Sequence, residues 1–227
     1  MSTFKNIVKS TATVFAGLTL ASAASAATFD FDLQAPTSSV NQSGSYADQY
    51  NYSVGGVDMS VKGFTNSGSG YTSQKVGIFN GFGMGVEQAS GSQHALDNNN
   101  GVDALLFTFQ QEMVLESVTS GWHTNDSDIS VYYLNGSNQL TKLEDETNLA
   151  DDLARNVNSG DISAKHWVVT AFDGVDKNIS FGNDYVKLSF LSFSDVASVP
   201  APTPATLGLM SIVLAGLGLR KRARKAA

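Results

Sequence analysis

The chain has 227 residues and no cysteine, and its 14 basic and 21 acidic residues give a formal net charge of −7. Disulfides, thiol nucleophiles and cysteine-ligated metals are therefore excluded. All the acidic residues but only seven of the basic ones lie between Ala27 and Pro204. That part has a net charge of −14, which excludes a nucleic-acid-binding surface built on Lys and Arg.

Residues 1–26 have the layout of a secretory signal peptide. Lys5 and Lys9 precede an apolar stretch of small residues, and Ala24 and Ala26 form an A-x-A cleavage site. The sequence thus predicts an exported protein that signal peptidase cuts close to Ala27.

Residues 27–198 predict one extracellular all-β domain, an antiparallel β-sandwich or jelly roll with one short helix. Apolar and polar residues alternate in short runs that are bounded by Gly, Asn and Asp, as is typical of half-buried strands. The predicted strands are Thr28–Leu33, Val57–Val61, Asp103–Phe109, Met113–Val118, Ile129–Leu134, His166–Phe172 and Tyr185–Phe193.

Three other segments interrupt this pattern. The polar stretches Ser38–Tyr52 and Thr65–Ser73 predict loops. Glu144–Val157 predicts the helix, because apolar residues recur at every fourth position and acidic residues occupy its first turn. Between Gly81 and Gly85, glycine at every second position predicts a loop with close backbone packing, since no βαβ unit surrounds it.

Two clusters of acidic and amide residues have two interpretations. One is calcium binding, since Ca²⁺ prefers six to eight oxygen ligands in a flexible arrangement. The other is ordinary Asx-turns between strands, in which Asn and Asp bond their own backbone. The candidate calcium ligands are Asp97, Asn99, Asp103, Asp126 and Asp128.

Signals for enzymatic activity are weak, and the sequence predicts a protein that is not an enzyme. His94, His123 and His166 have no metal-ligand spacing, and no nucleophile elbow or phosphate-binding loop is present. A glycoside hydrolase using Asp126 and Asp128 is a second alternative, because two carboxylates at i, i+2 of a strand project to one face.

Aromatic side chains offer a surface for stacking of sugar rings. Trp122 and Trp167 both lie next to strand-like runs, so a buried position in the core is the prediction for each. The candidate stacking residues are Tyr46, Tyr50, Tyr52, Tyr71 and Trp122.

The chain ends in a three-part segment, 199–227, with a proline-rich motif, an uncharged stretch and a basic end. As a helix, the uncharged residues 205–219 would be about 22 Å long, which is marginal for crossing a hydrocarbon core of about 30 Å. Basic residues behind it act as a stop and favour a cytoplasmic end, so the inner membrane holds the protein at least transiently. These residues are Arg220, Lys221, Arg222, Arg224 and Lys225.

This end of the chain resembles the PEP-CTERM sorting domain of Gram-negative bacteria, with threonine where that family has glutamate. The motif residues are Pro202, Thr203, Pro204, Ala205, Thr206 and Leu207. The resemblance implies recognition by an exosortase, removal of the tail, and release from the cell or attachment to its surface. Such proteins are associated with exopolysaccharide and biofilm matrix. The stretch from Val76 to Phe193 also resembles a group of exosortase-dependent surface proteins without an assigned activity.

We therefore expect an exported, exosortase-sorted protein of the cell surface or extracellular matrix, non-enzymatic and associated with extracellular polysaccharide. It needs no cofactor in this interpretation. The alternative from another class is a calcium-dependent carbohydrate-binding adhesin.

Overall fold

The computed structural model describes residues 25–87, 94–99, 101–125, 127–146, 148–157, 159–160, 162–173 and 184–196. All regular elements among them are strands, and every strand pairing is antiparallel. The all-β prediction is thus confirmed. The strands are β1 (Thr28–Asp32), β2 (Ser38–Val40), β3 (Tyr46–Ala47), β4 (Gln49–Val54), β5 (Val57–Asn66), β6 (Tyr71–Gln74), β7 (Val76–Phe79), β8 (Gly83–Val86), β9 (Leu96–Asp97), β10 (Val102–Asn125), β11 (Ile129–Leu134), β12 (Leu140–Glu146), β13 (Ala154–Asn156), β14 (Ala164–Ala171) and β15 (Asp184–Asp195).

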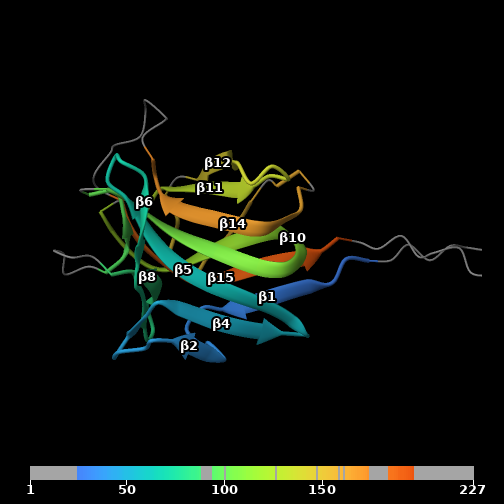
Figure 1. The fold of residues 1–227 in the computed structure, drawn as a ribbon, viewed down its shortest axis with the longest axis horizontal. Helices are drawn as coiled ribbons and strands as arrows, with labels where there is room; N and C mark the ends of the chain where they lie inside the picture. Colours follow the sequence, from blue (N-terminus) through green and yellow to red (C-terminus); the bar gives the residue numbers. More distant parts are fainter. Residues whose placement is uncertain are drawn as a thin grey trace, which may run out of the picture. The chain divides into compact units, whose positions relative to one another are not determined.

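Strand β10 organises the sheet. Its first part, up to Phe109, lies between β5 and β14, whereas the part from Met113 onward pairs with β15 and β13. The sequence predicts two strands here, and the structure joins them through Gln110–Glu112 into one strand of 24 residues. Hydrogen bonds connect all 15 strands, and the sheet curls on itself until it is nearly barrel-like (Figure 1).

The ends of this body lie side by side. Strand β1 pairs with the last strand from Thr28↔Ser194 to Asp32↔Phe190. Ala27 and Asp195 extend this pairing: the Asp195 amide donates to the Ala27 carbonyl at 3.0 Å, and the Ala27 amide donates to an Asp195 carboxylate oxygen at 2.6 Å. In Figure 1 the start of β1 and the end of β15 lie on the same side of the body.

The core lies inside the curled sheet, as the alternation of side chains requires. Phe31, Phe109 and Phe193 meet edge to face, with centroids 4.6–6.1 Å apart. Trp167 is fully buried, contacts Phe193, and donates its indole N–H to the carbonyl of Met113 at 2.9 Å. The predicted core position of Trp167 is confirmed.

The predicted helix at Glu144–Val157 is wrong for the described part of this stretch. Strand β12 continues to Glu146 in register with β11, and Ala154–Asn156 form a strand against β10. Leu149 is 2% exposed but Leu153 is 65% exposed, so these residues do not share one buried face. Pairing of these residues with β11 and β10 satisfies the backbone here and overrides the local helical pattern.

The predicted loop at Ser38–Tyr52 is also wrong in part, because it contains β2, β3 and most of β4. Its polar residues face outward while Tyr50 and Tyr52 are buried. Strand β6 likewise begins at Tyr71, within the second predicted loop. Within the described residues no helix is long and apolar enough to cross a membrane. The expected apolar segment 205–219, the sorting motif, the basic end and Ala24 lie outside the described residues.

Candidate functional site

A row of polar side chains crosses the outer face of the sheet over five strands. The register pairs Ser38 with Asn51, Asn51 with Ser60, Ser60 with Thr108, and Thr108 with His166. Their neighbours along β4, β5 and β10 are buried in the core, as is Trp167 next to His166 on β14, so these five residues, the polar row, point outward. The Thr108 hydroxyl lies 3.1 Å from Nδ1 of His166.

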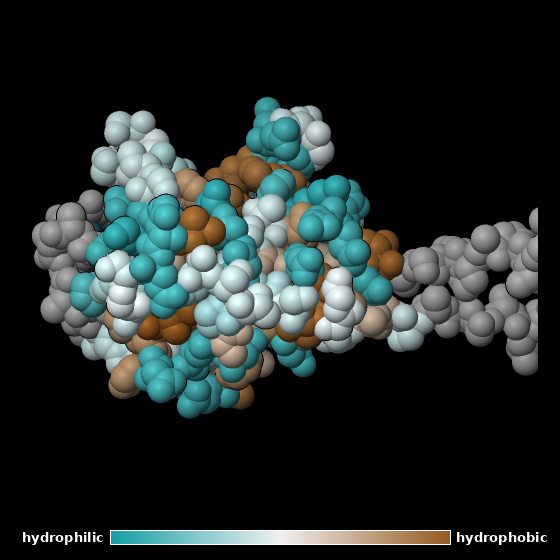
Figure 2. Space-filling view, turned by 60° about the horizontal axis from the view of Figure 1, so that its bottom comes forward, coloured by the Kyte–Doolittle hydropathy of each residue, from teal (hydrophilic) through white to brown (hydrophobic). Residues whose placement is uncertain are grey.

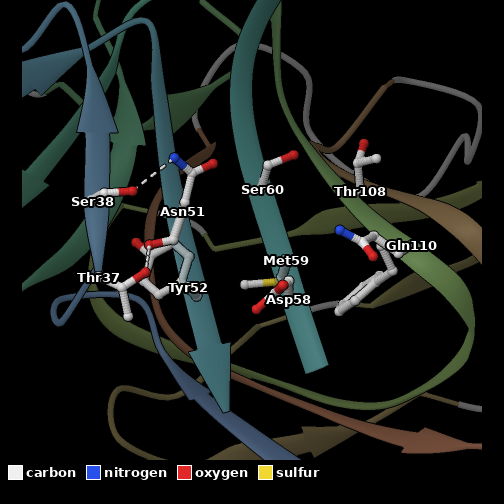
Figure 3. Close-up of a pocket in the computed structure, with 10 residues that line it drawn as sticks. Thr37, Ser38, Asn51, Tyr52, Asp58, Met59, Ser60, Thr108 and Gln110 are labelled. Carbon is white, nitrogen blue, oxygen red and sulfur yellow. Dashed lines mark hydrogen bonds between the residues drawn. The ribbon is translucent and has the colours of Figure 1, made fainter. Parts of the chain in front are cut away.

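A groove with a volume of about 430 Å³ runs along one part of this row (Figure 3). Thr37, Asp58 and Gln110 add further polar groups to its lining. The Asn51 amide donates to the Ser38 hydroxyl at 3.0 Å, and the Thr37 hydroxyl donates to the Asn51 carbonyl oxygen at 3.0 Å. Since ligand sites in proteins commonly have volumes of about 300–1,000 Å³, the groove is large enough for a small ligand.

The chemistry of the groove suits a ligand rich in hydroxyl groups. Hydroxyls and amides provide both donors and acceptors, and the Asp58 carboxylate adds a strong acceptor. Met59, Tyr52 and Phe109 also contribute to the lining and are themselves 2–3% exposed, so core packing fixes the strands beneath it. Among the described lining residues Asp58 is the one carboxylate, whereas glycoside hydrolysis commonly needs two.

The candidate calcium ligands are engaged in hydrogen bonds. A carboxylate oxygen of Asp97 accepts from the Asn99 amide at 3.0 Å, which is the geometry of the predicted Asx-turn. Asp103 accepts from the Thr65 hydroxyl at 2.5 Å, and Asp128 accepts from the Asn148 amide at 2.7 Å. Asn99 is exposed, and Asp126 lies outside the described residues.

The sequence did not single out Asp184, which the structure brings next to these ligands. Its carboxylate accepts hydrogen bonds from the Asn98 side chain and from the Asp128 amide, and the Asn98 side chain also donates to the Phe172 carbonyl at 3.0 Å. Asp97, Asp128 and Asp184 are at most 3% exposed. Nevertheless, no group of three or more His, Asp or Glu side chains in the described residues could hold a metal ion, so calcium binding stays a prediction.

The candidate stacking aromatics separate into two groups. Tyr50 and Tyr52 belong to the core, and burial raises the pKa of Tyr52 far above its ordinary value, with smaller contributions from Tyr50 and Asp32. Tyr71 is 41% exposed. Tyr46 and Trp122 are half-buried, so the core position predicted for Trp122 is wrong. The latter three thus remain candidates for stacking.

A lysine lies between two aromatic rings where the sequence indicated no site. Lys187 is 7% exposed, and its ammonium lies 3.8 Å from the centroid of the Trp122 ring and 5.0 Å from that of Phe79. Burial lowers the pKa of Lys187. In the described part of the chain no carboxylate lies within 4.0 Å of its ammonium. The rings therefore stabilise its charge by cation–π interaction.

The three histidines have separate surroundings. His94 stacks on Phe79 with a centroid distance of 5.7 Å, and its buried Nδ1 has no hydrogen-bond partner among the residues that the structure describes. His123 Nδ1 lies 2.8 Å from a carboxylate oxygen of Asp151, and His166 contacts Thr108. These partners differ from one histidine to the next.

No protein-family model, no curated protein and no solved structure matches this chain. The function is therefore inferred from the site itself.

Proposed function

We propose that this protein is exported and sorted by an exosortase to the cell surface or extracellular matrix, where it binds extracellular polysaccharide through the groove without hydrolysing it. The observation that supports binding is the polar row, four of whose five residues line one open groove with hydroxyl and amide groups on rigid strands. In this proposed protein the curled sheet is a β-sandwich of jelly-roll type, a signal peptide precedes it, and a C-terminal apolar helix follows it.

Binding without hydrolysis follows from the chemistry of the lining. Retaining and inverting hydrolysis both commonly use an acid and a second carboxylate on either side of the scissile bond. The described lining offers Asp58 as its carboxylate, together with neutral hydrogen-bonding groups. Such groups orient a sugar but do not provide the acid–base pair.

The groove is tested by titrating the purified protein with soluble neutral glucans in a calorimeter. Asn51→Ala and Gln110→Ala each remove an amide from the lining, and we expect each to weaken binding about tenfold, since an unpaired polar contact costs about 1–3 kcal/mol. Asn80→Ala is the matched control, because it removes an exposed amide that does not line the groove. Unchanged affinity in both groove variants would argue against this site.

Processing is tested by the intact mass of protein purified from its native host, in membrane and extracellular fractions separately. Loss of residues 1–26 and of the residues after about Pro204 is the result that sorting and cleavage predict. Retention of the basic residues 220–225 in the membrane fraction would instead make it a protein anchored by a single span.

A further inference from the structure

An apolar hollow lies on the same outer face of the sheet as the groove. It has a volume of about 240 Å³, and carbon atoms form its whole exposed lining. Tyr71 and Leu140 at its rim are both 41% exposed, so the hollow opens to solvent. The lining residues are Phe64, Tyr71, Ala104, Leu106, Leu134, Leu140 and Val168.

The strand register places this hollow directly beside the polar row. On β10 Leu106 lies two residues before Thr108, and on β14 Val168 lies two residues after His166, so each pair points to the same face. On β5 Phe64 lies four residues beyond Ser60, a distance of about 13 Å along the strand. Groove and hollow are therefore neighbouring parts of one surface.

A third depression extends this surface at the far end of the polar row. It has a volume of about 260 Å³ and is lined by His166 together with residues of the β11–β12 turn, among them Asn135 and Asn138. Leu134 lines both this depression and the apolar hollow. Through Thr108 and His166 the polar lining thus continues from the groove across β10 and β14 into the turn.

We propose that these three depressions form one extended site for a linear, uncharged polysaccharide, with the apolar faces of its rings against the hollow and its hydroxyl edges along the polar row. The inference rests on the proposed function and deepens it by naming the class of ligand. Pyranose rings combine an apolar face of C–H groups with a hydroxyl rim, and the surface pairs the same two chemistries side by side. Because the body carries a net charge of −14, a polyanion would be repelled.

The dependence of affinity on the length of the sugar oligomer distinguishes an extended site from a pocket for a single sugar. We would titrate the protein with β-linked glucose oligomers of increasing length, and with polygalacturonate as the acidic polymer. Affinity is expected to rise at least tenfold from the disaccharide to the longest oligomer and to change little with salt, because ion pairs do not carry it.

Tyr71→Ala is the decisive variant, since it removes an exposed aromatic side chain from the rim of the hollow. This variant should abolish the tenfold rise in affinity with oligomer length but leave the affinity of the groove for the disaccharide unchanged. Phe82→Ala is the matched control, because Phe82 is an aromatic residue that is 50% exposed and does not line the hollow.

The outcomes distinguish this inference from the function on which it rests. If affinity does not depend on length, or if Tyr71→Ala keeps the gain, the extended site is refuted while the groove survives. Salt-sensitive binding of polygalacturonate alone would also refute it. A dimer in sedimentation that Tyr71→Ala disrupts would instead assign the hollow to a second copy of this chain. Binding of no glycan at any length would overturn both proposals.

Discussion

Glycine at position 85 makes a quantitative test of the packing possible. Gly85 lies in β8, opposite Gly77 of β7. A Cβ atom added there would overlap the carbonyl oxygen of His94 and lie 2.8 Å from Cα of Ala95. Both atoms belong to backbone, so no side-chain rotation relieves the overlap, and the segment that begins at His94 must move.

The expected cost of Gly85→Ala follows from this geometry. Forcing extra atoms into a well-packed region costs about 1–3 kcal/mol. Displacement of the His94 segment would also disturb the stacking of His94 on Phe79 and the hydrogen bonds of Asn98 to Phe172 and Asp184. We therefore expect a loss of about 3 kcal/mol in the free energy of unfolding.

Two other glycines provide matched controls. An added Cβ meets nothing within 4 Å at Gly81 or Gly136, but Gly81 has a φ of +79°. Gly81→Ala should cost about 1–2 kcal/mol through the left-handed backbone alone. Gly136→Ala should be neutral or stabilise the protein by up to about 1 kcal/mol, because it restricts the unfolded chain.

The assay is urea-induced unfolding followed by the fluorescence of the buried Trp167, with two-state extrapolation to water. The predicted order of stability is Gly136→Ala at or above wild type, then Gly81→Ala, then Gly85→Ala. If the free energy of unfolding of Gly85→Ala lies within about 1 kcal/mol of the wild-type value, the contact between β8 and the His94 segment is not rigid, and this reasoning is refuted.

Three further predictions concern buried ionisable groups and calcium. Because burial raises the pKa of Tyr52, the unfolded chain releases this proton first, and stability should fall as pH rises above about 10. Tyr52→Phe should flatten that fall, but it should also cost about 1 kcal/mol at neutral pH, because it removes the 2.7 Å hydrogen bond to the Leu33 carbonyl. Urea titrations at alkaline and at neutral pH would measure both effects. Lys187 should change stability in the opposite direction. Because its pKa is lowered, the folded state releases the proton first, so stability should rise with pH just below 10.5. Lys187→Met should remove that rise in the same titrations. Millimolar Ca²⁺ should change the melting temperature by no more than about 1 °C relative to the calcium-free protein, because the carboxylates of Asp97, Asp103 and Asp128 already accept hydrogen bonds. A clear rise would favour the calcium-dependent adhesin.

Local patterns predicted those parts of the fold whose signal lies within one strand. The alternation at Thr28–Leu33 and the run Ile129–Leu134 correspond closely to β1 and β11. The glycines between Gly81 and Gly85 do mark close backbone packing: a Cβ at Gly83 would contact the backbone of Leu188, although β8 rather than a loop contains it. Each of these signals depends on residues adjacent in the chain.

The candidate site could not be predicted in this way, because it depends on strand register. Ser38, Asn51 and Ser60 are ordinary polar residues of strands and turns, and only pairing across β2, β4 and β5 aligns them. Lys187 is likewise hidden in the sequence, since its partners Trp122 and Phe79 come from β10 and β7. Register is specified by the burial of whole faces, not by any short motif.

The contact between Ala27 and Asp195 acquires a different meaning if signal peptidase cuts after Ala26. The Ala27 nitrogen, now an amide 2.6 Å from the Asp195 carboxylate, would become a free ammonium group at the same place. Proteolysis would then create an ion pair across the seam between the first and the last strand. Because the contact is exposed, the new charge would add at most about 1 kcal/mol and would be screened by salt. The cut that removes the signal peptide would thus also strengthen the contact between the first and the last strand of the folded body.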